Sequence, residues 1–502
     1  MKKVILLFIG VLCMPIVNAQ NINDALRYSQ NEIQGTARFR AMGGAFGAVG
    51  GDQSSISLNP AGSALFNSSE ASVTFSSIHN ENDTQYFNGF SNSSDANLDF
   101  QQAGVTFVFS SWDSPWKRLT LSVGYDKFQN FNDEWFAFGT NTNSIDSYFL
   151  HYAQGLPLSE ISAFPGESIS SAYADIGSIY GFGNQQAFLG YESYILEPEM
   201  ETDENTLYFS NIAPGEFDQE YFYAATGYNG KVTFNAATQY QDNLFLGLNL
   251  NSHILNYDRS TSFYEGNSNS GSLVNEVGFD NFLSTYGWGF SFQLGGILKL
   301  NDFFRVGLTY DSPTWLTIEE ETSQFISTVR NESGTNITQI IDPRIVNVFP
   351  SYKLQTPGKV TGSLAFVFQN QGIISFDYSM KDYGNTKFKP TSDSYFAVQN
   401  NIISERLTSA STYKIGGEYN YERFSFRGGY RFEESPYKDN TIDDLTGYSL
   451  GIGYNFGKTR LDITYDHSTQ NRNYQLFDVG LTDSANIDNK KSNVMLSLSF
   501  NI

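Results

Sequence analysis

The chain has 502 residues, 16% of them aromatic, and a formal net charge of −23 at pH 7. This acidic balance argues against a nucleic-acid partner, because phosphate backbones are bound by positive charge. No apolar run long enough for a helical membrane span follows the N-terminus. High aromatic and glycine content with weak hydropathy is instead typical of transmembrane β-barrels, in which only every second strand residue faces lipid. A soluble, acidic β-sandwich is the alternative.

Residues 1–19 have the features of a secretory signal peptide. Two lysines precede an apolar core at 4–12, and small residues at 17–19 form a cleavage site before Gln20. Cleavage removes the only cysteine, Cys13, so we expect no disulfide and no thiolate metal site in the mature chain.

Residues 20–69 have a composition unlike that of the rest of the chain. They contain too many glycines and alanines for a lipid-facing strand. The segment predicts compact turns and one or two helical turns folded inside a barrel, because small residues allow close approach to a wall. The candidate plug residues are Gly43, Gly44, Asn59, Pro60, Ala61 and Gly62.

From Glu70 onward, short turns alternate with long polar connections. Six short turns are predicted, near 114–115, 241–243, 301–302, 369–372, 420–422 and 456–458. Seven long loops are predicted, at 80–98, 129–230, 258–280, 312–357, 381–410, 433–445 and 468–491. Thirteen connections join fourteen strands, so we expect a 14-stranded antiparallel transmembrane β-barrel over residues 70–502, with short turns and both termini in the periplasm. The longest loop, at 129–230, is expected to contain short helices that cap the outer mouth.

The last nine residues, 494–502, alternate strictly. Five apolar side chains share one face, while Met495 and three small or polar residues share the other. An apolar face toward lipid and a small, polar face toward the lumen are typical of the closing strand of an outer-membrane barrel.

Several motifs, in a consistent order, resemble the FadL-type outer-membrane transporters of long-chain fatty acids and other hydrophobic compounds. They are the glycine–alanine run followed by 59–62, Gly287–Phe290 with 304–313, Gly416–Tyr419 with 426–430 and Ser435-Pro436, and Tyr448–Tyr454. The resemblance implies a plugged barrel for passive uptake of hydrophobic ligands, which some members release sideways through a gap in the wall. The chain departs from the family in its very long loop between the third and fourth strands and in its long, acidic outer loops.

Strand parity predicts that charged side chains share the lumen. The inward residues include Arg305, Asp377, Glu418, Arg427, Arg431 and Asp462, with Arg38 and Arg40 of the plug expected nearby. One interpretation is a structural network that braces barrel and plug, because buried charges need partners. The other is that an arginine, Arg427 first and Arg305 second, binds a ligand carboxylate.

The sequence contains no enzymatic or cofactor signature. The four histidines are scattered, no paired metal-ligand spacing occurs, and no Gly-x-Ser-x-Gly elbow is present. The acidic runs at 203–204, 319–321 and 443–444 predict solvated loops or weak Ca²⁺ or Mg²⁺ binding. The expected partners are hydrophobic small molecules, outer-membrane lipid and lipopolysaccharide, and proteins that contact the long loops. The alternative function is a non-transporting barrel that serves as scaffold or accessory subunit of a larger outer-membrane complex.

Overall fold

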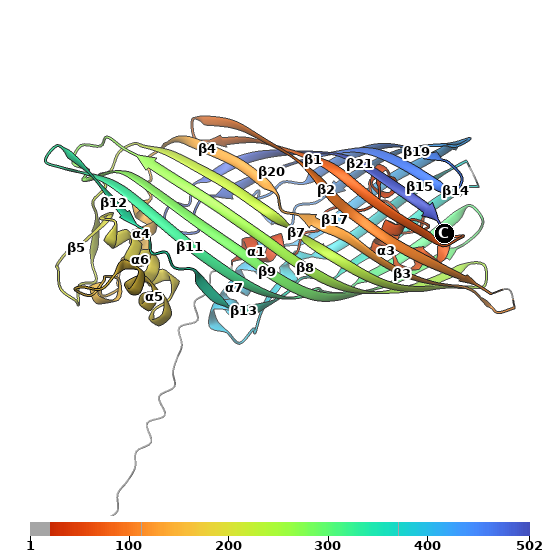
Figure 1. Cartoon of the computed structure of the whole chain (residues 1–502), viewed down its shortest axis with the longest axis horizontal. Helices are drawn as coiled ribbons and strands as arrows, with labels where there is room; N and C mark the ends of the chain where they lie inside the picture. The colour runs from red at the N-terminus through yellow and green to blue at the C-terminus, as the bar shows by residue number, and fades with distance from the viewer. Residues whose placement is uncertain (1–20, 112, 370) are drawn as a thin grey trace, which may run out of the picture.

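The computed structural model describes residues 21–502 except positions 112 and 370. The predicted signal peptide and Gln20 lie outside the described residues. Fourteen strands close into one antiparallel barrel, as predicted (Figure 1). In order around the wall they are β1 (Glu70–Tyr86), β2 (Gly89–Ser110), β3 (Trp116–Asn130), β7 (Phe217–Tyr240), β8 (Leu244–Gly266), β9 (Val274–Lys299), β10 (Phe304–Asp311), β14 (Lys359–Phe368), β15 (Gly372–Asp382), β17 (Ser409–Tyr421), β18 (Phe424–Glu433), β19 (Leu445–Asn455), β20 (Thr459–Gln475) and β21 (Ser484–Asn501).

The last strand closes the barrel. Strand β21 pairs with β1 on one side, in the register Glu70 to Asn501, and with β20 on the other, in the register Thr459 to Phe500. Along it Leu496 is exposed and Met495 is buried. The two-residue alternation read from the sequence therefore separates a lipid face from a luminal face.

All six predicted short turns join the expected strands, but several predicted loops are shorter than expected. Region 80–98 is part of a continuous hairpin, whose turn at residues 87–88 joins β1 to β2. Strands β8 and β9 likewise extend to Gly266 and begin at Val274. The bilayer needs only about ten residues of each strand. Beyond it the backbone ladder continues, with mostly polar side chains on both faces of the β1–β2 hairpin and with buried apolar side chains such as Leu255 and Phe279 on the inward face of β8 and β9. An alternation of lipid-facing apolar residues therefore does not predict these extensions.

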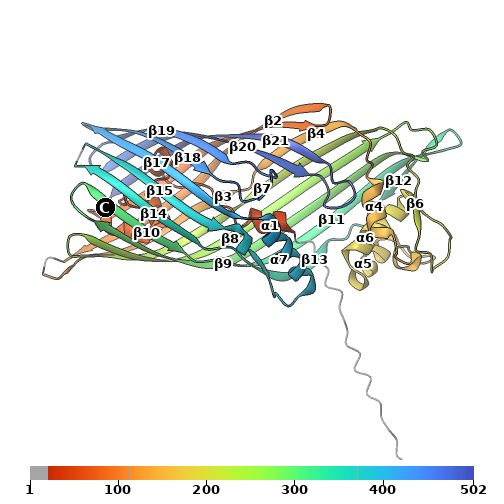
Figure 2. The same ribbon diagram turned by 180° about the vertical axis from the view of Figure 1, so that it is seen from behind.

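Two prolines, Pro313 and Pro357, interrupt neighbouring strands of the wall. Strand β10 is followed at Pro313 by a break and then β11 (Trp315–Glu332), which pairs with β9, β12 (Thr335–Ile341) and β13 (Asn347–Gln355). Strand β13 leads through Pro357 into β14 and also pairs with the short β16 (Lys387–Lys389). Helix α7 (Ser394–Arg406) lies beside β13 (Figure 2), and the helical turn η3 (Tyr383–Asn385) contacts α7.

The longest insertion caps the extracellular end of the barrel. After β4 (Asp133–Asn141), which pairs with β7, residues 142–216 form a helical subdomain at the end of the barrel far from the C-terminus (Figure 1). Its elements are α4 (Asp146–Ala153), η2 (Leu158–Glu160), α5 (Ile169–Ile179), α6 (Phe182–Glu192), β5 (Leu196–Pro198) and β6 (Tyr208–Ser210). The buried carboxylate of Glu265 on β8 accepts hydrogen bonds from Ser144 Oγ and the Ile145 backbone, which holds the start of α4 against the wall.

The N-terminal luminal segment, residues 21–69, folds inside the barrel. It contains α1 (Ile22–Arg27), α2 (Ala37–Ala41), α3 (Gln53–Leu58) and the turn η1 (Pro60–Leu65). Each of these short elements begins at a polar cap, such as Thr36 for α2, whose side chain accepts from a free backbone N–H. No helix among residues 21–502, positions 112 and 370 aside, has the length and hydropathy needed to cross a bilayer.

The two ends of the described chain lie at different heights in the barrel. The backbone N–H of Ile502 donates to Ser69 O at the short-turn end. Asn21, in contrast, donates to Asp478 in the extracellular β20–β21 loop. The expectation that both termini are periplasmic therefore does not extend to the first described residue, because α1 packs above the rest of the luminal segment.

Candidate functional site: the lumen

Small residues let the luminal segment touch the wall directly. A Cβ atom built on Gly429 would lie 2.1 Å from Gly43 N, and one on Gly307 would lie 2.4 Å from Gly47 O. Gly43 and Gly44 both have positive φ, at 61° and 72°, which side chains disfavour. Glycine in these wall strands therefore allows backbone contact between barrel and segment.

The predicted plug motif 59–62 lies against β7, β8 and β9. Asn59 Nδ2 donates to Gly47 O at 2.7 Å and to Gly296 O at 3.2 Å, while its Oδ1 accepts from Ala61 N. The carbonyl of Pro60 accepts from Asn235 Nδ2, and Gly62 O accepts from Gly51 N. The motif thus links the turns of the segment to one another and to the wall.

Four of the predicted luminal charges, Arg38, Glu418, Arg427 and Asp462, form one buried network. Arg38 makes two hydrogen bonds to Glu418, at 2.8 and 3.0 Å. Arg427 contacts Glu418 at 2.6 Å and Asp462 at 2.7 Å. Asp377 instead accepts from the backbone N–H groups of Phe46 and Gly47. One ion pair thus joins α2 of the segment to β17 of the wall. Two further ion pairs join β18 to β17 and to β20.

Arg40 and Arg431 share a partner that the sequence analysis missed. Both contact Asp466 on β20, Arg40 at 2.7 Å and Arg431 at 3.1 Å. Asp466 has the same strand parity as Asp462, so extending the alternation by four residues would have found it.

Neither arginine predicted to bind a ligand head group has the environment of such a site. The Arg427 side chain is 1% exposed and engaged by two carboxylates. Arg305 donates to Val49 O of the luminal segment at 3.0 Å. These contacts favour the structural interpretation for both residues.

We expect Arg427→Met to lower the stability of the barrel and to leave its ligand selectivity unchanged. Removing the guanidinium leaves Glu418 with Arg38 alone and deprives Asp462 of its Arg427 contact. Breaking a buried pair from one side costs about 3–5 kcal/mol. The temperature at which the folded, fast-migrating gel band disappears should fall. The affinities for a fatty acid and for its alcohol should change equally. A larger loss of affinity for the acid would show that Arg427 binds the carboxylate.

Four lysines line a cavity directly above the luminal segment, which we call the lysine chamber. Its two adjoining compartments have volumes of about 110 and 60 Å³ and share Lys231, Lys359 and Lys381, while Lys414 lines the larger one. Lys359 pairs with Asp311 at 2.9 Å. Among the described residues, no carboxylate lies within 4.0 Å of the other three ammonium groups.

The three unpaired lysines come from three strands. Lys231 on β7 is 4% exposed and lies 5.0 Å from the ring centroid of Phe128. Lys381 on β15 donates to Ser29 O and Asn31 Oδ1 of the luminal segment. Lys414 on β17 has the inward parity of Glu418. Parity alone would have placed Lys381 and Lys414 in the lumen, but only the fold shows that no carboxylate of a described residue lies within 4.0 Å of either ammonium group.

The wall beside the lysine chamber is interrupted. The β2–β3 ladder covers only Gln102–Ser110 with 118–126, and β2 above this point pairs with β1 alone. Asp126 and Phe128 of β3 line the chamber. Between them, Lys127 contacts Asp99 of β2 at 2.6 Å across the interruption.

The described residues contain no group of three His, Cys, Asp or Glu side chains arranged to hold a metal ion. Of the predicted acidic runs, 319–321 lies on β11 rather than in a loop, and its Glu320 accepts from Tyr352 Oη at 2.7 Å.

Comparison with known proteins identifies the family. Residues 229–501 match the family model described as outer membrane protein transport protein (OMPP1/FadL/TodX). The chain belongs to this family. Its members are non-enzymatic barrels, and the chain is accordingly an outer-membrane transporter of hydrophobic compounds.

Solved structures agree on the fold. A Pseudomonas aeruginosa FadL homologue superposes with a TM-score of 0.53 at 10% identity, over 94% of this chain and 99% of its own. The Pseudomonas putida toluene transporter TodX gives 0.51 at 12% identity, over 94% of this chain and 100% of its own. No curated protein is significantly similar in sequence.

Proposed function

We propose that this FadL/TodX-family barrel takes up amphiphiles with an anionic head group, long-chain fatty acids above all, by passive diffusion. The observation that carries the proposal is the lysine chamber, in which Lys231, Lys381 and Lys414 have no carboxylate of a described residue within 4.0 Å, although Glu32, Asp126, Glu433 and Glu434 also line the chamber. A buried, unpaired cation is costly, and an incoming carboxylate lowers that cost. A neutral aromatic hydrocarbon would leave the same charges uncompensated.

The chamber's surroundings suit an amphiphile. Ile33, Phe39 and Leu58 of the luminal segment offer apolar surface beside the lysines. The interruption between β2 and β3 adjoins the chamber, so we propose that it is the lateral exit toward lipid. Residues 20–69 are the proposed plug, and residues 29–34, which contact Lys381, are the part that must move for passage.

The test compares a long-chain fatty acid with its alcohol on the purified barrel. We expect the acid to bind at least about tenfold more tightly, because hydrogen bonds to charged groups contribute about 1.5–3 kcal/mol. Lengthening the chain should strengthen both by up to about 0.8 kcal/mol per buried methylene. Calorimetric titration measures the preference.

The double substitution Lys231→Met and Lys381→Met should abolish the preference for the acid while retaining alcohol binding. The matched control is Lys490→Met, because Lys490 lies on the outward side of β21 and pairs with Asp83. An unchanged preference in the double variant would contradict the lysine site. A barrel that binds neither compound would favour the scaffold function.

A further inference from the structure

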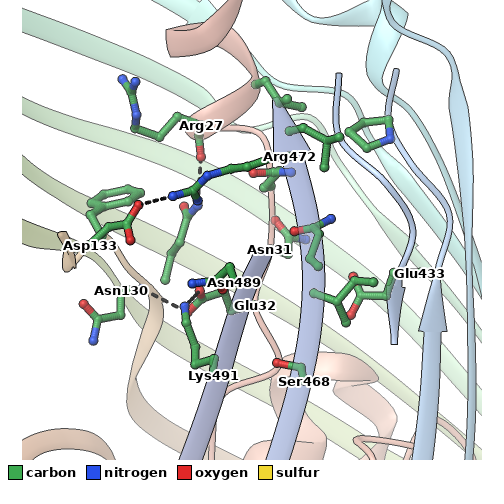
Figure 3. Close-up of a pocket in the computed structure, with 18 of the residues that line it drawn as sticks. Arg27, Asn31, Glu32, Asn130, Asp133, Glu433, Ser468, Arg472, Asn489 and Lys491 are labelled. Atoms are coloured by element: carbon green, nitrogen blue, oxygen red, sulfur yellow. Dashed lines mark hydrogen bonds and ion pairs between the residues drawn. The ribbon is translucent and has the colours of Figure 1, made fainter. Parts of the chain in front are cut away.

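A third and larger cavity, which we call the amide chamber, lies between the luminal segment and the upper part of the wall. Its volume is about 300 Å³. It is lined by residues 23–33 of the segment, the end of β3, β20 at 468–474, β21 at 489–491 and the β18–β19 loop (Figure 3). Residues 31–33 border both this cavity and the lysine chamber and so separate the two.

The basic residues around the amide chamber are already paired with carboxylates. Figure 3 shows Arg472 reaching across to Asp133 and Lys491 to Glu32. Although burial opposes its charge, the Lys491 ammonium at 2.7 Å holds the pKa of Glu32 below its usual value. The other basic residues of the lining are Arg27, paired with Asp24, and Arg40 and Arg431, both paired with Asp466. An incoming anion would therefore meet no unpaired cation, in contrast to the lysine chamber.

The rest of the lining is made of amides and aromatic rings. Ten Asn and Gln side chains border the chamber, together with seven aromatic residues. An amide offers a planar donor and acceptor side by side, which matches a hydroxyl group that both donates and accepts. Aromatic rings offer flat apolar surface to the C–H faces of a ring-shaped solute.

Several buried polar atoms of this lining lack a hydrogen-bond partner. They are Nε1 of Trp135, Oε1 of Gln129 and Nε of Arg40, Arg431 and Arg472. Buried polar groups in folded proteins are normally hydrogen-bonded, so a solute or water that reached any of these atoms would be stabilised. An apolar tail would leave them unpaired at a cost in free energy.

We propose that the amide chamber binds a neutral glycosyl group. Such a group supplies hydroxyls for the unpartnered donors and acceptor, needs no free cation, and presents C–H faces to the aromatic rings. It arrives either as a free saccharide or as the head group of a glycolipid. This site is separate from the lysine chamber and does not depend on the proposed carboxylate binding.

The test titrates the barrel, purified in dodecylphosphocholine, with maltose and with trace dodecyl maltoside in calorimetry, using empty micelles as the blank. Equal binding of both probes identifies a free saccharide as the ligand. Binding of dodecyl maltoside alone identifies a glycolipid head group. Binding of neither probe, or tighter binding of methyl glucuronide than of methyl glucoside, overturns the proposal.

Variants connect the signal to the chamber. Trp135→Phe and Gln129→Met each remove one unpartnered atom, and Gln129→Met also removes the Nε2 donor to Arg27 O. Each should weaken glycoside binding about fivefold, the effect of one neutral hydrogen bond. Trp288→Phe, on the lipid-facing surface and 45% exposed, should leave it unchanged. Heat-modifiable gel mobility checks that each variant is folded, and unchanged affinity in both chamber variants overturns the proposal.

The lysine variants separate this proposal from the proposed function. Lys231→Met with Lys381→Met should remove fatty-acid preference and leave glycoside affinity within about twofold, because neither lysine lines the amide chamber. Loss of both activities in the lysine variant would mean that the two cavities act as one site and would overturn the separate glycosyl site.

Discussion

Deleting residues 21–62 is expected to raise single-channel conductance several-fold. These residues hydrogen-bond to inward side chains around the whole wall, from Asn235 on β7 to Ser497 on β21. Without them, the lysine and amide chambers join the periplasmic half of the lumen as one water-filled path. Planar-bilayer recordings of the purified barrel measure the change.

The deletion also removes partners of the buried charges, so folding must be checked beside conductance. Glu418 retains Arg427 and Asp466 retains Arg431 within the wall, and we therefore expect the truncated barrel to keep its heat-modifiable mobility. A folded deletion variant with unchanged conductance would place the segment outside the conducting path.

Deleting residues 494–502 is expected to abolish stable insertion. These residues pair with Glu70–Ser77 of β1 and with 459–465 of β20, so their loss opens two strand edges at bilayer height. Backbone groups that face hydrocarbon without partners cost several kcal/mol each. Outer-membrane fractions should contain little of the truncated protein, and its gel mobility should not depend on heating.

A conservative change in the same strand provides the control. Leu498→Ile keeps the lipid-facing side chain apolar and every backbone pairing intact, so insertion should be normal. Normal heat-modifiable mobility of the truncated barrel would show that β20 and β1 can close without β21.

The cavities distinguish this chain from a simple hydrophobic channel. The lumen contains a chamber with four lysines next to the wall interruption and a second chamber whose basic residues are all paired with carboxylates. The family transports hydrophobic compounds, yet polar side chains line much of both chambers. A ligand with a polar head and an apolar tail satisfies both facts, because the tail can pass toward lipid while the head remains in the lumen.

The sequence by itself determined the features that depend on local alternation. The two-residue period fixed which side chains of β15, β17, β18 and β20 face inward, and the turn residues fixed all six short connections. It could not fix the height of the barrel, because the backbone ladder continues beyond the bilayer, where the alternation of lipid-facing apolar residues stops.

Only the tertiary structure decided which inward charged side chains have a partner of opposite charge within ion-pair distance. Arg38 and Glu418 are 380 positions apart, and nothing in either local sequence predicts their contact. Such long-range pairing engages Arg427, predicted to bind a ligand, and leaves Lys231, Lys381 and Lys414 without a carboxylate of the described chain within 4.0 Å. Side-chain direction follows from backbone geometry within a strand, whereas the compensation of a buried charge depends on segments that folding brings together.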